Sequence, residues 1–505
     1  MRTGAHEAVS RNEGNEVKRD GRQEFTEAHS TREAGTPTPG DPVEGRGGRV
    51  TEPREGKTTG SLALDKVSTK LARIAELAKE DSSRALRSLA HHVDVDFLKE
   101  AFQRTRKDGA KGVDGVAATD YEAQLDANLA SLLDRFKSGS YRAPPVRRVH
   151  IPKGDGKTRP IGIPTFEDKL LQRAVAMILN AIYEQDFLPC SYGFRPGRSA
   201  HQALEALWKG LMDTGECWIV DADIKGFFDT LEPKHLRDFL DQRVQDGVIR
   251  RTIDKWLKAG VQEDGSLSVP ETGTPQGGVI SPILANVYLH EVLDKWFHDV
   301  VKPRVEGAAF MVRYADDFVL VFKHEDDARR VHDVLPKRFG RYGLTLHPTK
   351  TRLVHFTMPG RSEDDSDPKG SDDVDPPHTF TLLGFTHYWA RSRKGNRVVK
   401  RKTSKSRLAR AIARIAEWCR QHLHEPIEEQ RKALAMKLRG HCNYYGITGN
   451  SGALGEFRQE LLRIWRAALD RRSHHSHVTW ERFNVLLTHH PLPPAIAVHS
   501  TGRLR

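Results

Sequence analysis

The sequence predicts an α+β protein in which a mixed region of short strands and helices is followed by a helical region. From Tyr141 onward, short apolar runs alternate with Pro and Gly, a texture typical of strands joined by turns. Two apolar runs, 308–314 and 318–322, flank a turn that carries two carboxylates, which predicts a β-hairpin. Beyond about Arg391 the apolar spacing becomes helical and the charge strongly basic.

Composition narrows the class of protein before any motif is considered. The chain has 505 residues with 80 Lys+Arg against 68 Asp+Glu, a formal charge of +12, and it has four cysteines without a CxxC pair. No stretch approaches 18 uncharged apolar residues and the N-terminus has no apolar segment, so we expect neither a membrane span, a membrane partner nor a secretory signal. A disulfide scaffold and a cysteine zinc site are also not expected, and a reducing cytoplasm fits.

The N-terminal part divides into a polar tail and a helical region. Residues 1–60 contain 10 Lys/Arg and 11 Asp/Glu with few branched or aromatic residues, so they cannot bury enough apolar surface to offset the entropy of ordering. We interpret them as a disordered tail. Apolar residues at helical spacing then predict helices over residues 61–145.

Residues 146–385 contain the strands of the predicted mixed region. The runs VRRVHIPK and RPIGIPT, joined by Gly154–Gly156, predict a hairpin, and a long helix follows from Glu167 to about Tyr183. The run WIVDADI, residues 218–224, predicts a buried strand. An acidic, proline-containing insert at 361–377 is typical of a solvated loop.

Carboxylates on two of these strands are the sharpest signal. Asp316 and Asp317 lie at the tip of the predicted hairpin, where an ordinary polar turn is the alternative interpretation. Asp221 and Asp223 alternate on one face of WIVDADI. If that strand pairs beside the hairpin, the carboxylates converge, and like charges so close repel unless cations lie between them. Mg²⁺ prefers such hard oxygen ligands, and two ions in this arrangement predict nucleotidyl transfer.

The motifs around these carboxylates resemble those of reverse transcriptases. Tyr-Ala-Asp-Asp (314–317) resembles their metal-binding motif, DIKGFF (223–228) their first palm motif, and GTPQGGVISPILANVYL (273–289) their nucleotide-pocket motif. HIPKGDGKTRPIGIPT and SYGFRPGRSAHQAL are similar to blocks of the bacterial group II intron type, and LTLHPTKT and LLGF to the last palm blocks. The resemblance covers residues 105–385 in the family's order. It implies a right-hand polymerase, with fingers and an antiparallel palm sheet in residues 146–385 and a helical fingers extension in 61–145.

The resemblance implies roles for the carboxylates. Asp223, Asp316 and Asp317 would be catalytic and hold two Mg²⁺ ions, with Mn²⁺ as the alternative metal and Asp317 as the weaker ligand. Asp221 is not at the family's metal position, and we interpret it as a solvated or salt-bridged group.

It also implies a nucleotide pocket. Phe228 would stack under the incoming sugar and exclude a 2′-hydroxyl, although core packing explains it as well. Gln276 would contact the nucleotide, and Gly277 would allow close backbone approach. Lys153 and Arg159 would contact the triphosphate, with plain surface exposure as the alternative. Lys350 is a candidate proton donor to pyrophosphate.

The basic C-terminal region is predicted to bind RNA. Residues 391–472 contain 21 Lys/Arg and 7 Asp/Glu, and aromatic residues, among them Trp418, Trp465 and Trp480, interleave with the basic ones. A solvated helical bundle is the alternative, but aromatic and arginine planes suit unpaired bases and phosphates.

Part of that region is similar to one domain of group II intron proteins. LRGHCNYYGITGN (438–450) and RRS (471–473) resemble the thumb, or maturase X, domain, which implies such a domain over 386–485 and a C-terminal tail over 486–505. The RNA-binding residues expected from it are Arg439, Tyr444, Tyr445, Arg471 and Arg472.

A further family feature is expected to be missing. Many relatives carry a Cys-rich HNH endonuclease after the X domain, whereas about 20 residues follow Phe483 and no Cys follows Cys442. We therefore expect no HNH domain, so that the DNA primer would come from a pre-existing 3′ end or another nuclease. The nearby histidines His474, His475 and His477 are interpreted as a polar tail rather than a metal cluster.

The function implied by the resemblance is that of a group II intron-encoded reverse transcriptase and maturase. Its partners would be its intron RNA in a ribonucleoprotein, an RNA template, a DNA primer, dNTPs and target DNA, in the bacterial cytoplasm and at the nucleoid. Two alternatives stay open. The chain would be a splicing cofactor with a vestigial polymerase, or a reverse transcriptase of another setting, such as a CRISPR-associated or domesticated one.

Overall fold

The computed structural model describes residues 58–152, 158–263, 266–268, 277–358, 378–392, 394–472 and 477–499. These belong to the larger of two compact units, residues 45–505. Most of the predicted tail, the Gly154–Gly156 turn and the acidic insert at 361–377 lie outside the described residues. Helix α1 begins at Thr58, two residues before the predicted end of that tail.

The N-terminal helices pack around one long buried helix, α5 (Phe166–Tyr183), which confirms the helix predicted from Glu167. The Thr165 hydroxyl caps α5 by accepting a hydrogen bond from the Asp168 amide, and Leu170, Leu171 and Ile178 are completely buried. The surrounding helices are α1 (Thr58–Glu80), η1 (Ala90–His92), α2 (Val95–Arg104), α3 (Ala118–Glu122), α4 (Leu125–Ser138) and α9 (Gly247–Leu257).

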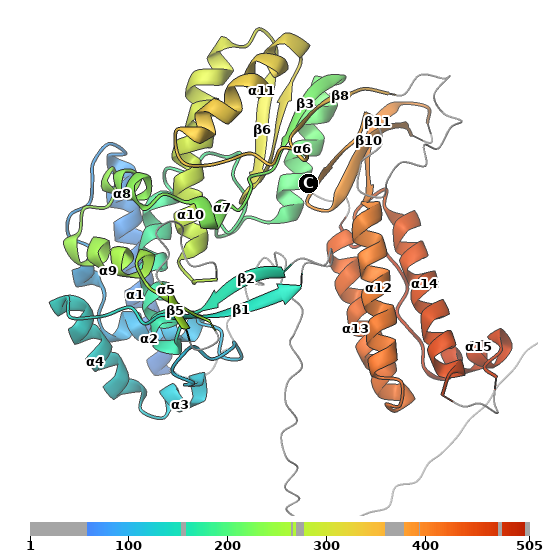
Figure 1. The fold of residues 1–505 in the computed structure, drawn as a ribbon, viewed down its shortest axis with the longest axis horizontal. Helices are drawn as coiled ribbons and strands as arrows, with labels where there is room; N and C mark the ends of the chain where they lie inside the picture. The colour runs from blue at the N-terminus through green and yellow to red at the C-terminus, as the bar shows by residue number, and fades with distance from the viewer. Residues whose placement is uncertain are drawn as a thin grey trace, which may run out of the picture. The chain divides into compact units, whose positions relative to one another are not determined.

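Two four-stranded sheets carry the predicted strands (Figure 1). In the first, β1 (Val146–Pro152) and β2 (Thr158–Ile163) form the predicted antiparallel hairpin, with β4 (Val261–Glu263) parallel to β1 and β5 (Ser266–Ser268) antiparallel to β4. The second, which we call the central sheet, has the order β6-β7-β3-β8 and is antiparallel throughout. Its strands are β3 (Cys217–Ala222), β6 (Ala309–Tyr314), β7 (Asp317–Phe322) and β8 (Arg352–Phe356).

Helices cover both faces of the central sheet because its buried residues alternate. Ile219 of β3 belongs to the same apolar cluster as Leu207 of α6 (Ala200–Thr214), whereas its neighbour Val220 belongs to that of Leu335 in α11 (Glu325–Gly340). The remaining helices of this part are α7 (Phe227–Thr230), α8 (Pro233–Asp241), α10 (Ser281–Leu289), the π-helical η2 (His290–Asp294) and η3 (Trp296–Val301), and η4 (Lys302–Arg304).

The C-terminal part combines a small sheet with four helices. The sheet has the order β11-β10-β9, from β9 (Phe380–Leu382), β10 (Phe385–Arg391) and β11 (Arg397–Thr403). The helical pattern expected from about residue 391 is therefore wrong for β11, where buried and exposed residues alternate and favour a strand. The helices are α12 (Lys405–Gln421), α13 (Ile427–Tyr445), α14 (Ser451–Asp470) and α15 (Trp480–His489).

Two boundaries differ from the predicted ones. Helix α15 continues to His489, inside the predicted C-terminal tail. Leu492 is buried, and His499 pairs with Ile447 in an isolated parallel bridge, so this end of the described chain packs against the helices. Among the helices in the described part of the chain, none combines the length and apolar character that a membrane crossing requires.

Candidate active site

The three predicted catalytic carboxylates meet at one end of the central sheet. Tyr314 pairs with Asp317 across the β6–β7 hairpin, which leaves Ala315 and Asp316 as a two-residue turn. Ala222, the last residue of β3, is opposite Phe318 of β7. Asp223 follows Ala222, so the same register brings it beside Asp317.

The carboxylates influence one another electrostatically. Desolvation and then the charge of Asp223 raise the pKa of Asp316. The pKa of Asp317 is raised by desolvation, then by Asp316 and Asp223. The charges of the neighbouring carboxylates are the part of this rise in pKa that a bound cation would relieve.

The donor set fits a hard divalent cation that takes part of its shell from a substrate. No set of three or more His, Cys, Asp or Glu side chains in the described residues is arranged to hold a metal ion by itself. Mg²⁺ is commonly bound through one or two carboxylates, with substrate phosphates and water completing the octahedron. Crowded carboxylates with raised pKa values are suited to that role.

Lys350 lies beside the first of these carboxylates. Its Nζ donates a hydrogen bond of 2.8 Å to Asp223 Oδ2, and its side chain remains 62% exposed. The backbone arranges this contact, since the His347 amide donates to the Asp223 carbonyl at 2.7 Å and thereby holds the 347–350 segment against the end of β3. Asp221 pairs instead with Arg352 at 3.2 Å, which confirms its interpretation as a salt-bridged group.

Besides Lys350, three of the predicted nucleotide-pocket residues are described. Arg159 on β2 is exposed, and its charge lowers the pKa of Asp316, so it lies within electrostatic reach of the turn. Phe228 is half-buried in α7, with its ring centroid 5.3 Å from that of Phe227. Gly277 has φ +112°, and a Cβ there would lie 2.5 Å from the Gly162 carbonyl oxygen, so only glycine fits against β2. Lys153 and Gln276 lie outside the described residues.

The predicted RNA-binding residues lie on α13 and directly after α14. Arg439 is exposed on α13 and Arg471 is exposed after α14. Arg472 donates to the backbone carbonyls of Leu423 and Glu425 and thus holds the loop between α12 and α13. The contact of these arginines with RNA stays a prediction.

The aromatic residues of this region have internal partners. The Tyr444 hydroxyl donates to the Leu383 carbonyl at 3.0 Å, and the rings of Tyr444 and Tyr445 pack on Phe385. Trp465 is completely buried, and its Nε1 donates to Gln430 Oε1 at 2.9 Å. The suggestion that Trp465 contributes an aromatic plane for RNA is therefore wrong, because it fills the core of the helical bundle.

The structure adds residues to which the motif analysis assigned no role. The loop that follows α5 lies directly on the Ala315–Asp316 turn, since a Cβ on Gly193 would be 2.3 Å from the Ala315 amide nitrogen. Phe194 beside it has φ +57° and is 52% exposed, and its ring centroid is 6.4 Å from that of Tyr314. Arg313, a charged residue inside the apolar β6 sequence, is completely buried. Its charge interrupts the apolar run of β6, and this interruption is the sequence feature that points to Arg313.

Known proteins resemble the chain over the same region. Residues 151–387 match the family model described as "Reverse transcriptase (RNA-dependent DNA polymerase)". Protein YkfC of Escherichia coli (strain K12) is 36% identical to this chain over 330 residues, which cover 58% of this chain and 85% of that protein. This chain belongs to the reverse transcriptase family. The predicted activity, RNA-directed DNA polymerase, is the activity of that family.

Two further relatives of this reverse transcriptase are named for introns. The "Group II intron-encoded protein LtrA" of Lactococcus lactis subsp. cremoris is 26% identical over 475 residues, which cover 77% of this chain and 75% of that protein. "Nuclear intron maturase 2, mitochondrial" of Arabidopsis thaliana is 27% identical over 179 residues, covering 27% of this chain and 24% of that protein. The resemblance to group II intron-encoded reverse transcriptases and maturases is confirmed. The expected lack of an HNH domain stays a prediction.

Proposed function

We propose that this reverse transcriptase is encoded by a group II intron, copies its intron RNA into DNA at a primed target, and binds the same RNA to assist its splicing. The observation that carries the polymerase part is the convergence of Asp223, Asp316 and Asp317 at one end of the central sheet. The similarity to the intron-encoded protein of Lactococcus, which extends over most of both chains, supports the intron part.

The polymerase architecture follows from the placement of that site. The central sheet would be the palm, the β1–β2 hairpin and the helices around α5 the fingers, and α12–α15 the thumb and maturase domain. Arg159, on the hairpin, would reach the triphosphate of a nucleotide bound at the carboxylates. The charge of Arg407 on α12 lowers the pKa of Asp317, so a basic residue of the proposed thumb lies within electrostatic reach of this site.

The chemistry would be divided among a few groups. Asp223, Asp316 and Asp317 would hold two Mg²⁺ ions, or Mn²⁺, which when bound supply charge neutralisation and favour the ionised primer 3′-hydroxyl. Lys350, hydrogen-bonded to Asp223, would give a proton to the departing pyrophosphate. Phe228 would exclude a ribose 2′-hydroxyl.

Two residues of the proposed nucleotide pocket are assigned from their positions in the sequence motifs. Lys153 would share the triphosphate with Arg159, and Gln276 would contact the nucleotide where Gly277 lets the backbone approach β2. The partners would then be an RNA template, a DNA primer, dNTPs and target DNA.

Primer extension on poly(rA)/oligo(dT) tests the polymerase assignment. Asp316→Asn and Asp317→Asn keep the size of each side chain and remove its charge, so DNA synthesis should fall by about a thousandfold or more. Asp326→Asn, an exposed aspartate of α11, is the matched control and should retain wild-type activity. Binding of the intron RNA should be unchanged in all three. Full synthesis by the Asp316 variant would overturn the assignment of the catalytic carboxylates. An inactive wild-type enzyme that still promotes splicing would overturn the polymerase assignment in favour of a splicing cofactor.

RNA binding by the basic helical region has its own test. Each phosphate neutralised by Lys or Arg releases counterions, so log K for intron RNA should fall steeply as log[salt] rises. Arg439→Ala and Arg471→Ala should each weaken binding and make that slope shallower by about 0.7–0.9, whereas Arg341→Ala, just after α11 and outside the basic region, should change neither. A flat salt response would contradict the assignment, and equal binding of an unrelated RNA would favour a reverse transcriptase of another setting.

A further inference from the structure

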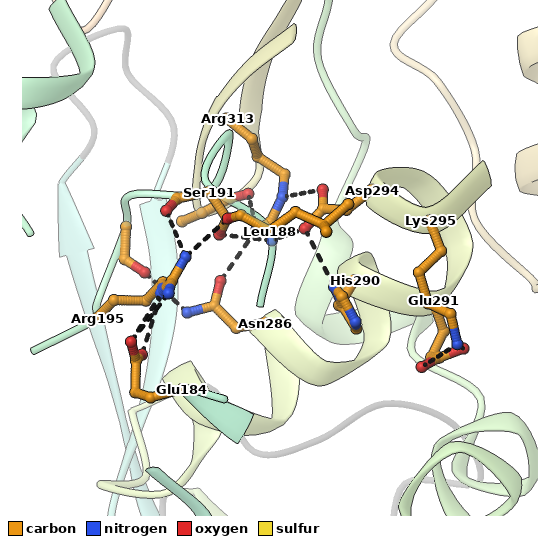
Figure 2. A network of polar contacts seen from close by, with 12 residues as sticks. Glu184, Leu188, Ser191, Arg195, Asn286, His290, Glu291, Asp294, Lys295 and Arg313 are labelled. Atoms are coloured by element: carbon orange, nitrogen blue, oxygen red, sulfur yellow. Dashed lines mark hydrogen bonds and ion pairs between the residues drawn. The ribbon is translucent and has the colours of Figure 1, made fainter. Parts of the chain in front are cut away.

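Arg313 lies in β6, two residues before the catalytic turn, and it is paired with a buried carboxylate. Its Nε donates to Asp294 Oδ1 at 2.7 Å and its Nη2 donates to Asp294 Oδ2 at 2.6 Å, a two-pronged ion pair in which both side chains are completely excluded from solvent (Figure 2). Two charges removed from water in this way are costly unless every polar atom is satisfied.

The other hydrogens of the guanidinium are used as well. Nη1 donates to Asn286 Oδ1 at 3.0 Å and to the Ala315 carbonyl at 3.0 Å, and Nη2 donates a second bond to Ser191 Oγ at 2.7 Å. With the two bonds to Asp294, all five N–H groups of Arg313 have an acceptor. One of those acceptors is a backbone atom of the catalytic turn itself.

That turn needs external support. Ala315 has φ +57°, in the left-handed region that a residue with a Cβ seldom adopts, and such a conformation persists only where the surroundings hold it. Gly193 packs on the Ala315 amide. Asn286, which accepts from Arg313, also donates through Nδ2 to the Gly193 carbonyl at 2.8 Å, so one network connects Arg313 with the residue that packs on the Ala315 amide.

The helix that supplies two of these partners has an unusual geometry. Asn286 lies on α10 and Asp294 ends η2, a π-helical segment. Eight residues apart on an α-helix, their side chains would point about 80° away from each other. The wider turns of the π-helix reduce that angle, so both side chains reach the same guanidinium. The irregular helix thus serves the Arg313 contact.

We propose that Arg313 is a positioning residue for catalysis: through the Ala315 carbonyl, it holds the turn in the strained conformation that presents Asp316 and Asp317 to Asp223. This inference rests on the proposed metal-binding role of those carboxylates. A lysine cannot replace Arg313, because it has three donors at one nitrogen and cannot make the fork to Asp294 while it reaches the turn.

The closing experiment compares Arg313→Lys with Arg243→Lys in the full-length protein. Arg243 is a matched control: it is buried, pairs with Asp186 at 2.7 Å, and donates to the backbone carbonyls of Asp81, Arg84 and Ala78, none of which the site uses. Both variants should lower the melting temperature. Arg313→Lys alone should lower kcat by about tenfold to a hundredfold and weaken Mn²⁺ binding measured by electron paramagnetic resonance, with KM for dNTP and Kd for primer–template near wild type.

Ser191→Ala is the milder companion, since it removes one acceptor of Arg313 and no charge. It should lower kcat by about twofold to fivefold and shift Mn²⁺ affinity in the same direction, with a smaller loss of melting temperature than Arg313→Lys. The proposal is overturned if Arg313→Lys and Arg243→Lys lose kcat equally with Mn²⁺ affinity intact, or, should Arg313→Lys not fold, if Ser191→Ala behaves as wild type. Asp316→Asn reports separately on the carboxylates: if it keeps Mn²⁺ binding and synthesis, the proposed function fails rather than the positioning role.

Discussion

Lys350 Nζ donates a 2.8 Å hydrogen bond to Asp223 Oδ2, so a cation of the protein occupies the carboxylate that a metal ion would need. The lysine side chain is 62% exposed, and ion pairs of this kind contribute little to stability. Lys350 can therefore leave Asp223 when a metal ion and a triphosphate bind, which is what a proton donor to pyrophosphate requires.

Lys350→Ala should separate the competition of Lys350 with a metal ion from its role as a proton donor. Removing the competing cation should lower the Mg²⁺ concentration for half-maximal activity, while loss of the proton donor should lower kcat by about a hundredfold. Single-turnover primer extension over a Mg²⁺ series measures both. Lys323→Ala, an exposed lysine after the far end of β7, should change neither quantity. An unchanged kcat, or a higher Mg²⁺ requirement, would remove Lys350 from the mechanism.

Phe228→Ala should admit ribonucleotides. The ring is half-buried beside Phe227, so part of it remains available to an incoming sugar. Its removal should raise the ratio of kcat/KM for rNTP to that for dNTP by roughly 10- to 100-fold. Phe228→Tyr keeps the ring and should keep the wild-type ratio. If Phe228→Ala leaves the ratio unchanged and lowers only the melting temperature, the residue serves core packing alone.

Trp465→Ala should unfold the helical C-terminal region far more readily than Trp480→Ala. Trp465 is completely buried and hydrogen-bonded to Gln430, so truncation should cost about 3–5 kcal/mol. Trp480 is 47% exposed and should cost about 1 kcal/mol. Denaturant unfolding followed by tryptophan fluorescence measures the difference. Similar losses in both variants would contradict the assignment of Trp465 to the core.

Asp168→Asn should change how stability depends on pH. Asp168 accepts from the Tyr141 hydroxyl, from Trp256 Nε1 at 2.6 Å and from Gln172 Nε2 at 3.1 Å, but desolvation prevails and raises its pKa to about 6. The folded protein therefore holds this proton more tightly than the unfolded chain, and the free energy of unfolding falls as the pH rises from about 4 to about 6.

The asparagine variant lacks this titration. Relative to wild type, its free energy of unfolding should therefore rise by about 3 kcal/mol between pH 4 and pH 7, because two pKa units correspond to that amount. Melting temperatures of both proteins over this range test the prediction, and groups shared by both cancel in the difference. A constant difference would mean that Asp168 titrates alike in the folded and unfolded states.

Short-range sequence patterns are sufficient to predict the helices and strands that carry the candidate site. The β1–β2 hairpin, helix α5 and the β6–β7 hairpin all follow from apolar spacing and turn residues within short windows. The convergence of Asp223 with Asp317 followed from one assumption, that β3 pairs beside the hairpin, and the register of β3 with β7 confirms it. Where alternation and helical spacing compete, as in β11, the local pattern was misread.

The sequence by itself determined which residue types stand at the catalytic turn and which family they belong to, because those signals lie in contiguous blocks. Only the tertiary structure decided what holds the turn in place. Arg313 finds its acceptors at Ser191, Asn286 and Asp294, which come from a loop, an α-helix and a π-helical turn. Contacts between segments so far apart leave no periodicity in the sequence. A buried arginine in an apolar strand indicates that partners exist, and packing alone determines which ones they are.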